Sequence, residues 1–164
     1  MKLERVRAGA ILGSLVALAV VGCAIGTTTT MGSGDPVADR QRLMKNVGAN
    51  WAEIQSKVKA GNAEAVAVNA EVLSLHAQRI TSYFPEGSLS DKSKAKPDIW
   101  QKWPEFQAAA KNLENRAGTL RDQAIAKDAA AVTTTVATFG RDACGNCHTP
   151  FRVPPPQQPA APRS

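Results

Sequence analysis

The sequence predicts an all-α protein, and specifically an antiparallel four-helix bundle. Apolar residues recur at helical spacing in four segments, and no strand-like alternation of useful length is present. The chain is rich in alanine and holds only three Trp, one Tyr and four Phe, which favours helices over a β-sandwich. A length of 164 residues suits one ordinary domain, and an apolar fraction of 43% excludes wholesale disorder.

The first predicted helix begins at Asp35-Pro36, because the ring of proline fixes the backbone angle φ at a value that suits the first turn of a helix. Its apolar stripe has the spacings of seven, three and four that are typical of a packed helix. The stripe consists of Val37, Met44, Val47, Trp51, Ile54 and Val58. Gly61-Asn62 interrupts this pattern, so we expect the helix to end there.

The second predicted helix carries Ala65, Val68, Val72 and Leu75 and runs towards Tyr83-Phe84. The segment Pro85-Glu86-Gly87-Ser88 stops it. A polar loop then runs to Pro97 and contains Lys92, Lys94 and Lys96, which either form a solvated loop or steer an acidic redox partner.

The third predicted helix follows Trp103-Pro104, and Asp128 can cap the fourth. Apolar residues alternate by four and three in the third helix: Phe106, Ala110, Leu113, Ala117, Leu120 and Ala124. The fourth helix carries Val132, Val136, Phe139 and Ala143. The Thr-rich stretch between Val132 and Val136 has weak helix propensity, so tertiary packing must hold it.

Residues 1–22 are predicted to be a signal peptide of the lipoprotein type. Lys2, Arg5 and Arg7 precede an apolar stretch at 8–21, which is too short for a membrane span of roughly 20 residues. The following Val20-Val21-Gly22-Cys23 resembles a bacterial lipobox, which implies a lipid on Cys23 and an anchor in the membrane of a Gram-negative bacterium. Ordinary cleavage near Ala24 is the alternative.

Residues 23–34 have no periodic apolar pattern and are predicted to form a flexible tether. Six prolines follow His148, so residues 153–164 are predicted to be a disordered, Pro-rich tail. The formal net charge of +6 falls to +4 when residues 1–22, with three basic residues and one acidic residue, are removed. Export and the lack of an interleaved basic and aromatic patch argue against nucleic-acid binding.

The segment Cys144-Gly145-Asn146-Cys147-His148 is a C-x-x-C-H motif, the attachment signature of c-type haem. On a helix the two cysteines share a face, so that each thiol can form a thioether with one haem vinyl group. His148 lies on the same side and can direct a ring nitrogen at the iron. A thioredoxin-like redox pair would need a βαβ context, and a zinc site would need more ligands than the remaining His76.

Four motifs in order resemble the class II c-type cytochromes, which are cytochrome c′ and its low-spin, Met-ligated relatives. They are Arg40-Gln41-x-x-Met44-Lys45, Phe84-Pro85-Glu86-Gly87, Lys94-Ala95-Lys96-Pro97-x-Ile99-Trp100, and the terminal Cys-x-x-Cys-His-x-x-x-Arg that ends at Arg152. The resemblance implies that residues 35–152 form a four-helix haem domain, with one covalent haem c attached near the C-terminus.

The resemblance also implies roles around the iron. Met44 matches the first-helix residue that faces the iron opposite the proximal histidine, although a methionine on an apolar stripe is more often core filler. His76 is the rival ligand, although a lone helix histidine is more often structural. Arg40 and Gln41 match a pair that bonds a haem propionate, with a solvated helix surface as the alternative.

Arg152 matches a basic residue that lies near the proximal imidazole in this family. In that place we expect its charge to raise the reduction potential by disfavouring added positive charge on the iron. Pro150 departs from the usual residue at that spacing, which puts the placement of Arg152 in doubt.

The first expectation is therefore a periplasmic electron carrier with His148 and Met44 on the iron, docking with redox partner proteins and performing no enzymatic turnover. The alternative is a five-coordinate haem protein that binds nitric oxide or carbon monoxide. Many relatives pair through their first two helices, so a homodimer is a further expectation.

Overall fold

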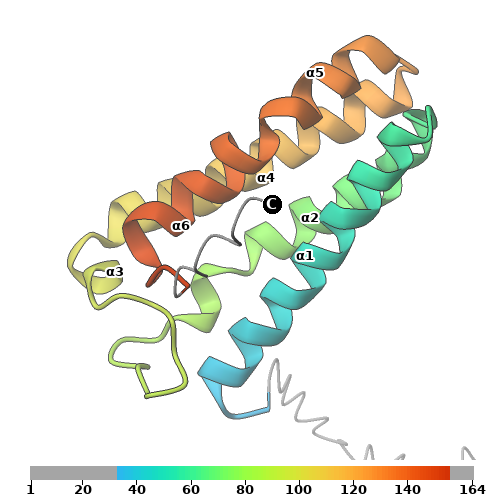
Figure 1. Ribbon diagram of the computed structural model, residues 1–164. Helices are drawn as coiled ribbons and strands as arrows, with labels where there is room; N and C mark the ends of the chain where they lie inside the picture. The colour runs from blue at the N-terminus through green and yellow to red at the C-terminus, as the bar shows by residue number, and fades with distance from the viewer. Residues whose placement is uncertain (1–32, 156–164) are drawn as a thin grey trace, which may run out of the picture.

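The computed structural model describes residues 33–155 of the chain. The predicted signal peptide, Cys23 and the greater part of the predicted tether and tail lie outside the described residues. Four long helices dominate the described part (Figure 1): α1 (Pro36–Lys59), α2 (Ala67–Gln78), α4 (Trp103–Ile125) and α5 (Ala129–Phe139). Between residues 33 and 155 the only β pairing is an isolated antiparallel bridge, so the predicted all-α, four-helix fold class is confirmed.

Helix α1 begins where the sequence predicts. The carboxylate of Asp35 accepts hydrogen bonds from the backbone N–H groups of Val37 at 2.9 Å and Ala38 at 3.1 Å. These bonds satisfy two donors that have no partner inside the helix. The helix ends just before Gly61, whose φ of +76° lies in the left-handed region that glycine adopts without strain.

The second helix is shorter than predicted. A 3₁₀ turn, η1 (Glu64–Val66), precedes α2, and the chain leaves the α-helix after Gln78 for a second 3₁₀ turn, η2 (Thr81–Tyr83). Phe84 has φ −122° and ψ 55°, outside the helical region. The ring of the following Pro85 disfavours the helical conformation at the residue before it, which explains why the helix does not reach Phe84.

The last predicted helix is divided into three parts. Helix α5 continues into a π-helical segment, η3 (Gly140–Gly145), and then into α6 (Asn146–Phe151). The side-chain amide of Asn112 on α4 donates a 2.7 Å hydrogen bond to the backbone carbonyl of Asp142 inside this segment. The π-helical segment includes Cys144 and Gly145, the first two residues of the C-x-x-C-H motif, and such segments are frequent at functional sites.

The Thr-rich part of α5 is helical despite its weak propensity. The hydroxyl groups of Thr133 and Thr134 donate to the carbonyls of Ala129 and Ala130, one turn earlier. Val132, on the inner face of the same stretch, is completely buried. Burial of the apolar side chains therefore holds this part of the helix, as the sequence analysis expects.

The core lies between two helix pairs. Figure 1 shows α1 beside α2 and α4 beside α5, and α2 also packs along α4. Helices α1 and α5 approach each other at the end that carries the α1–α2 and α4–α5 connections, and they diverge towards α6 (Figure 1). The largest fully buried side chains are Phe106, Phe139, Ile54, Leu73, Ile99, Leu120, Val66 and Val132.

Two short elements complete the diverging end of the bundle. A loop runs from Phe84 to Pro97, and the one-turn helix α3 (Asp98–Gln101) joins it to α4. Among residues 33–155, no helix has the length and apolar character that a membrane crossing requires.

Candidate functional site

A cavity of about 760 Å³ lies at the end of the bundle where α1 and α5 diverge. This volume falls in the range of roughly 300–1,000 Å³ that is typical of cofactor and small-molecule sites. Its walls come from α1, the loop before α3, α4, η3 and α6, and most of the lining side chains are apolar. They include Val47, Ile80, Phe84, Ile99, Phe106, Ala109, Ala110, Leu113, Ala143 and Phe151.

One wall carries all three functional residues of the C-x-x-C-H motif. Cys144 comes from η3, and Cys147 and His148 come from α6. Both cysteines are free and half-buried. The structure thus places in one cavity the two thiols and the imidazole that the sequence predicts to act together.

Burial sets the protonation of these groups. It raises the pKa of the Cys147 thiol to about 11, with a smaller contribution from Cys144, and it also raises the pKa of Cys144. Burial lowers the pKa of His148, and the positive charge of Arg152 lowers it further. Near neutral pH the wall therefore presents two neutral thiols and a neutral imidazole, which is the form of histidine that coordinates a metal.

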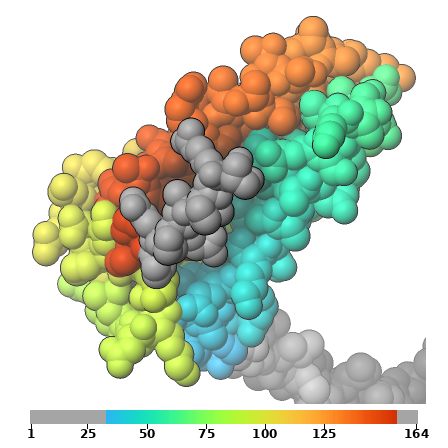
Figure 2. Space-filling view, viewed as in Figure 1, coloured from blue at the N-terminus to red at the C-terminus, as the bar shows by residue number. Residues whose placement is uncertain are grey.

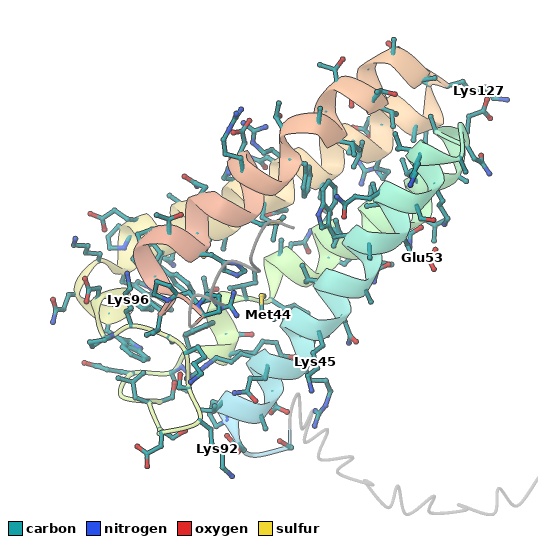
Figure 3. All side chains as sticks on the ribbon, in the orientation of Figure 1. Met44, Lys45, Glu53, Lys92, Lys96 and Lys127 are labelled. Carbon is teal, nitrogen blue, oxygen red and sulfur yellow. The ribbon has the colours of Figure 1, made fainter. Side chains whose placement is uncertain are left out.

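The opposite wall is formed by α1 and carries Met44. Figure 3 shows Met44 projecting from α1 towards the space that faces α6, and its side chain is one of the cavity-lining groups. Trp51, two turns further along α1, also lines the cavity and stacks on Phe139 with ring centroids 4.8 Å apart and an interplanar angle of 20°. Met44, Val47 and Trp51 thus give the α1 wall an apolar part, and the polar residues of the same wall are Arg40, Gln41 and Lys45.

These residues fit a haem c group. The cavity has the size and the apolar lining that a porphyrin needs, the paired thiols can form thioethers with two vinyl groups, and the imidazole can bind iron. A haem held in this way would be bounded by the wall of Cys144, Cys147 and His148 and by the wall of Met44. His76, the rival ligand, belongs to α2 and is not among the cavity-lining residues.

Arg40 has a role that the sequence analysis missed. It lines the cavity, but only 5% of its surface is exposed. Its guanidinium donates to the carbonyl of Tyr83 at 3.3 Å, to the hydroxyl and carbonyl of Ser88 at 3.0 and 2.6 Å, and to the hydroxyl of Ser93 at 2.8 Å. A sequence pattern could not reveal these bonds, because their acceptors lie 43 to 53 residues away along the chain.

Gln41 also lines the cavity, and its side-chain amide donates to the carbonyl of Lys92 at 2.8 Å. Contact of Arg40 and Gln41 with a haem propionate stays a prediction. Lys45 and Lys94 lie on the same cavity and are exposed, and the sequence analysis did not assign either to the site.

Arg152 lies at the cavity, as the resemblance implies, in spite of Pro150. Its backbone N–H donates a 3.0 Å hydrogen bond to the carbonyl of His148, and its side chain lines the cavity. Pro150 is accommodated within α6, and the next residue, Phe151, is buried edge-on against Phe106 with ring centroids 5.4 Å apart. This aromatic contact anchors the end of α6, the helix that carries Cys147 and His148.

Comparisons with known proteins agree with this arrangement. A family model described as Cytochrome C′ matches residues 35–152. The chain is 32% identical to cytochrome c-556 of Agrobacterium fabrum (strain C58) over 159 residues, which cover 93% of this chain and 97% of the relative. It is also 32% identical over 117 residues to a cytochrome c′ of Pararhodospirillum photometricum, covering 69% of this chain and 92% of that protein.

Solved structures share the fold. One is a cytochrome c′ with an unusual ligand-controlled dimer dissociation, to which the chain is 25% identical with a TM-score of 0.65. That similarity covers 73% of this chain and 95% of the solved chain.

Proposed function

The chain belongs to the cytochrome c′ family, which implies covalently bound haem c and its iron, and from this premise we propose that the protein binds a small gas molecule such as nitric oxide or carbon monoxide. The observation that carries the proposal is one cavity with Cys144, Cys147 and His148 on one wall and the apolar side chains of Met44, Val47 and Trp51 on the wall of α1. An apolar wall suits a small uncharged diatomic ligand, because the ligand brings no polar group that would lack a partner.

Haem c supplies the iron, and with it the gas affinity and the redox chemistry. The chain supplies the attachment through Cys144 and Cys147 and the axial imidazole of His148. It also supplies the opposite face, where the apolar side chains of Trp51 and Val47 line the cavity. The single C-x-x-C-H motif supports one haem per chain, and nothing in this scheme requires enzymatic turnover.

Electron transfer with His148 and Met44 as the two axial ligands, which the sequence analysis expects first, is the second candidate. It is favoured by the position of Met44 on the wall opposite His148 (Figure 3). A thioether is a soft ligand that favours ferrous iron and raises the reduction potential. The chain is related to the cytochromes c′, and one of these has a dimer whose dissociation is controlled by a ligand. This relationship supports gas binding more strongly than electron transfer.

Absorption spectra of the oxidised and reduced holoprotein, followed by titration of the reduced form with carbon monoxide, separate the two candidates. Gas binding predicts a high-spin spectrum and rapid formation of the carbon monoxide complex. Low-spin bands with a Met–iron charge-transfer feature and no response to carbon monoxide would instead favour the electron carrier. As a control, the C144A/C147A double variant should leave the haem extractable by acidified organic solvent.

Export to the periplasm with a lipid anchor at Cys23 is part of the proposal and rests on the sequence of residues 1–23. Expressed from its full-length gene in a Gram-negative host, the wild-type protein should sediment with membranes. The C23S variant should appear in the soluble periplasmic fraction. Equal membrane association of both proteins would overturn the anchor.

A homodimer through the first two helices is supported by two apolar side chains on the outside of α2. Val68 and Leu75, seven residues apart, are 72% and 49% exposed. A spacing of seven puts them on one face of the helix, where a second copy could cover them. Analytical ultracentrifugation with and without carbon monoxide should show a dimer that the V68E/L75E variant loses.

A further inference from the structure

Residues 84–96 connect η2 to α3 and pass beside the cavity, and we call this segment the strap. Figure 2 shows the yellow-green surface of this segment in contact both with the blue start of α1 and with the red surface of α6. Ser93, Lys94 and Ala95 of the strap are cavity-lining residues. The strap therefore forms part of the cavity wall between α1 and α6.

On one side the strap is bound to α1. Two of its residues, Ser88 and Ser93, accept three of the four hydrogen bonds of the Arg40 guanidinium, and Gln41 donates to the carbonyl of Lys92. The Arg40 guanidinium also lies over the ring of Phe84, 4.7 Å from the centroid. Arg40 thus holds both the beginning and the far part of the strap.

On the other side the strap is bound to the segment that follows His148. The N–H of Lys96 donates to the carbonyl of Phe151 at 2.9 Å, and the N–H of Val153 donates to the carbonyl of Lys94 at 2.8 Å. These bonds form the isolated bridge between Ala95 and Arg152. The strap consequently links the helix that bears Met44 to the helix that bears His148.

The energetics favour a closed strap. A buried guanidinium needs hydrogen-bond partners, and bonds from a charged donor are stronger than neutral ones. Lifting the strap would deprive Arg40 of its acceptors at Ser88 and Ser93 while the cation lies in a nearly buried position. Removing the guanidinium abolishes this penalty and so lets the strap open more often.

We propose that Arg40 is a positioning residue that keeps the strap closed and thereby restricts which ligands reach the iron. Carbon monoxide fits the closed cavity, whereas a bulky ligand such as imidazole enters only when the strap opens. This inference rests on the proposed haem in the cavity, but the closure of the strap itself is measurable without any iron ligand.

The experiment compares the ferric and ferrous holoprotein of the wild type, R40M and the S88A/S93A double variant. R42M is the matched control, because it removes an exposed arginine from the same helix. Arg42 pairs with Asp39 and makes no bond to the strap. The first measurement is the initial rate of tryptic cleavage after Lys92 and Lys94. The second is the affinity of ferric iron for imidazole, and the third is the affinity of ferrous iron for carbon monoxide.

For R40M we expect cleavage in the strap and imidazole affinity to rise by the same factor, roughly tenfold, which corresponds to about 1.4 kcal/mol. Both quantities scale with the fraction of molecules whose strap is open. Carbon monoxide affinity should change by less than about twofold, since this ligand fits the closed cavity. R42M should match the wild type in all three measurements.

S88A/S93A retains Arg40 and should show smaller changes in the same direction. If R40M does not hold haem, this double variant tests whether the bonds of Arg40 keep the strap closed. Cleavage and imidazole affinity equal to those of the wild type would overturn the role of Arg40. Faster cleavage without a change in imidazole affinity would overturn the restriction of ligands. If the wild type holds no covalent haem, the proposed function fails, and the tryptic comparison still tests the strap.

Discussion

The backbone N–H of Arg152 donates a 3.0 Å hydrogen bond to the carbonyl of His148, so the residue expected to modulate the iron is tied to the residue expected to bind it. The guanidinium is near enough to lower the pKa of the His148 imidazole, after the larger effect of burial. A positive charge that disfavours a second positive charge on the imidazole also disfavours the additional positive charge of ferric iron.

The R152Q variant is therefore expected to have a lower reduction potential than the wild type. The change should be on the order of tens of millivolts, since an exposed charge is strongly screened by solvent. Potentiometric titration of the holoprotein measures it, with R42Q as a control that removes an exposed arginine outside the cavity lining. An unchanged potential in R152Q would contradict an electrostatic role.

Replacement of Met44 tests the sixth coordination position. If the thioether binds the iron, M44A should convert a low-spin spectrum to a high-spin one and admit carbon monoxide. If the iron is already five-coordinate, M44A should keep the high-spin spectrum and only enlarge the distal space. Absorption spectra of both oxidation states measure this, and a low-spin spectrum retained in M44A would point to an external ligand or to His76.

The stack of Trp51 on Phe139 joins α1 to α5 beside the cavity. Phe139 is completely buried, so F139A should lower the free energy of unfolding by roughly 3–5 kcal/mol through loss of apolar contacts and the cavity left behind. F139L keeps much of the volume and should cost less. Urea unfolding of the holoprotein, followed by far-ultraviolet circular dichroism, measures the difference, and equal losses for both variants would argue against packing as the cause.

Thiol reactivity reports the burial of the motif before haem is attached. With its pKa raised to about 11, Cys147 of the folded haem-free chain holds a very small fraction of thiolate at pH 8. Its alkylation by iodoacetamide should therefore be on the order of a hundredfold slower than that of an unperturbed cysteine. Because the raised pKa favours the neutral thiol, the rate should keep rising as the pH increases beyond 9.

The comparison for this measurement is the same chain in concentrated urea, where the pKa of Cys147 returns to its ordinary value. Mass spectrometry after peptide cleavage separates Cys144 from Cys147. Equal alkylation rates in native buffer and in urea would show that the haem-free motif is not buried as described.

Local sequence signals predicted the fold class, and they predicted that Cys144, Cys147 and His148 lie together, which the shared cavity wall confirms. The start of α1 at Asp35-Pro36 depends on residues that are neighbours in the chain, and so does the C-x-x-C-H segment at 144–148. Helical periodicity likewise predicted α1, α4 and α5, because it depends on residues that are close together in the chain. The second helix was predicted too long because the apolar pattern continues to Phe84, whereas Pro85 prevents helical geometry before it.

The sequence by itself thus determined which residues can hold haem, because two thiols and an imidazole at fixed spacing carry that chemistry in any helical context. Only the tertiary structure decided what surrounds them. Three features follow from no local sequence pattern. They are the π-helical turn of η3, the bonds of Arg40 to Ser88 and Ser93, and the bridge between Ala95 and Arg152. These features depend on which buried donors and acceptors meet after the helices pack, since each buried polar group must find its partner wherever the fold provides one.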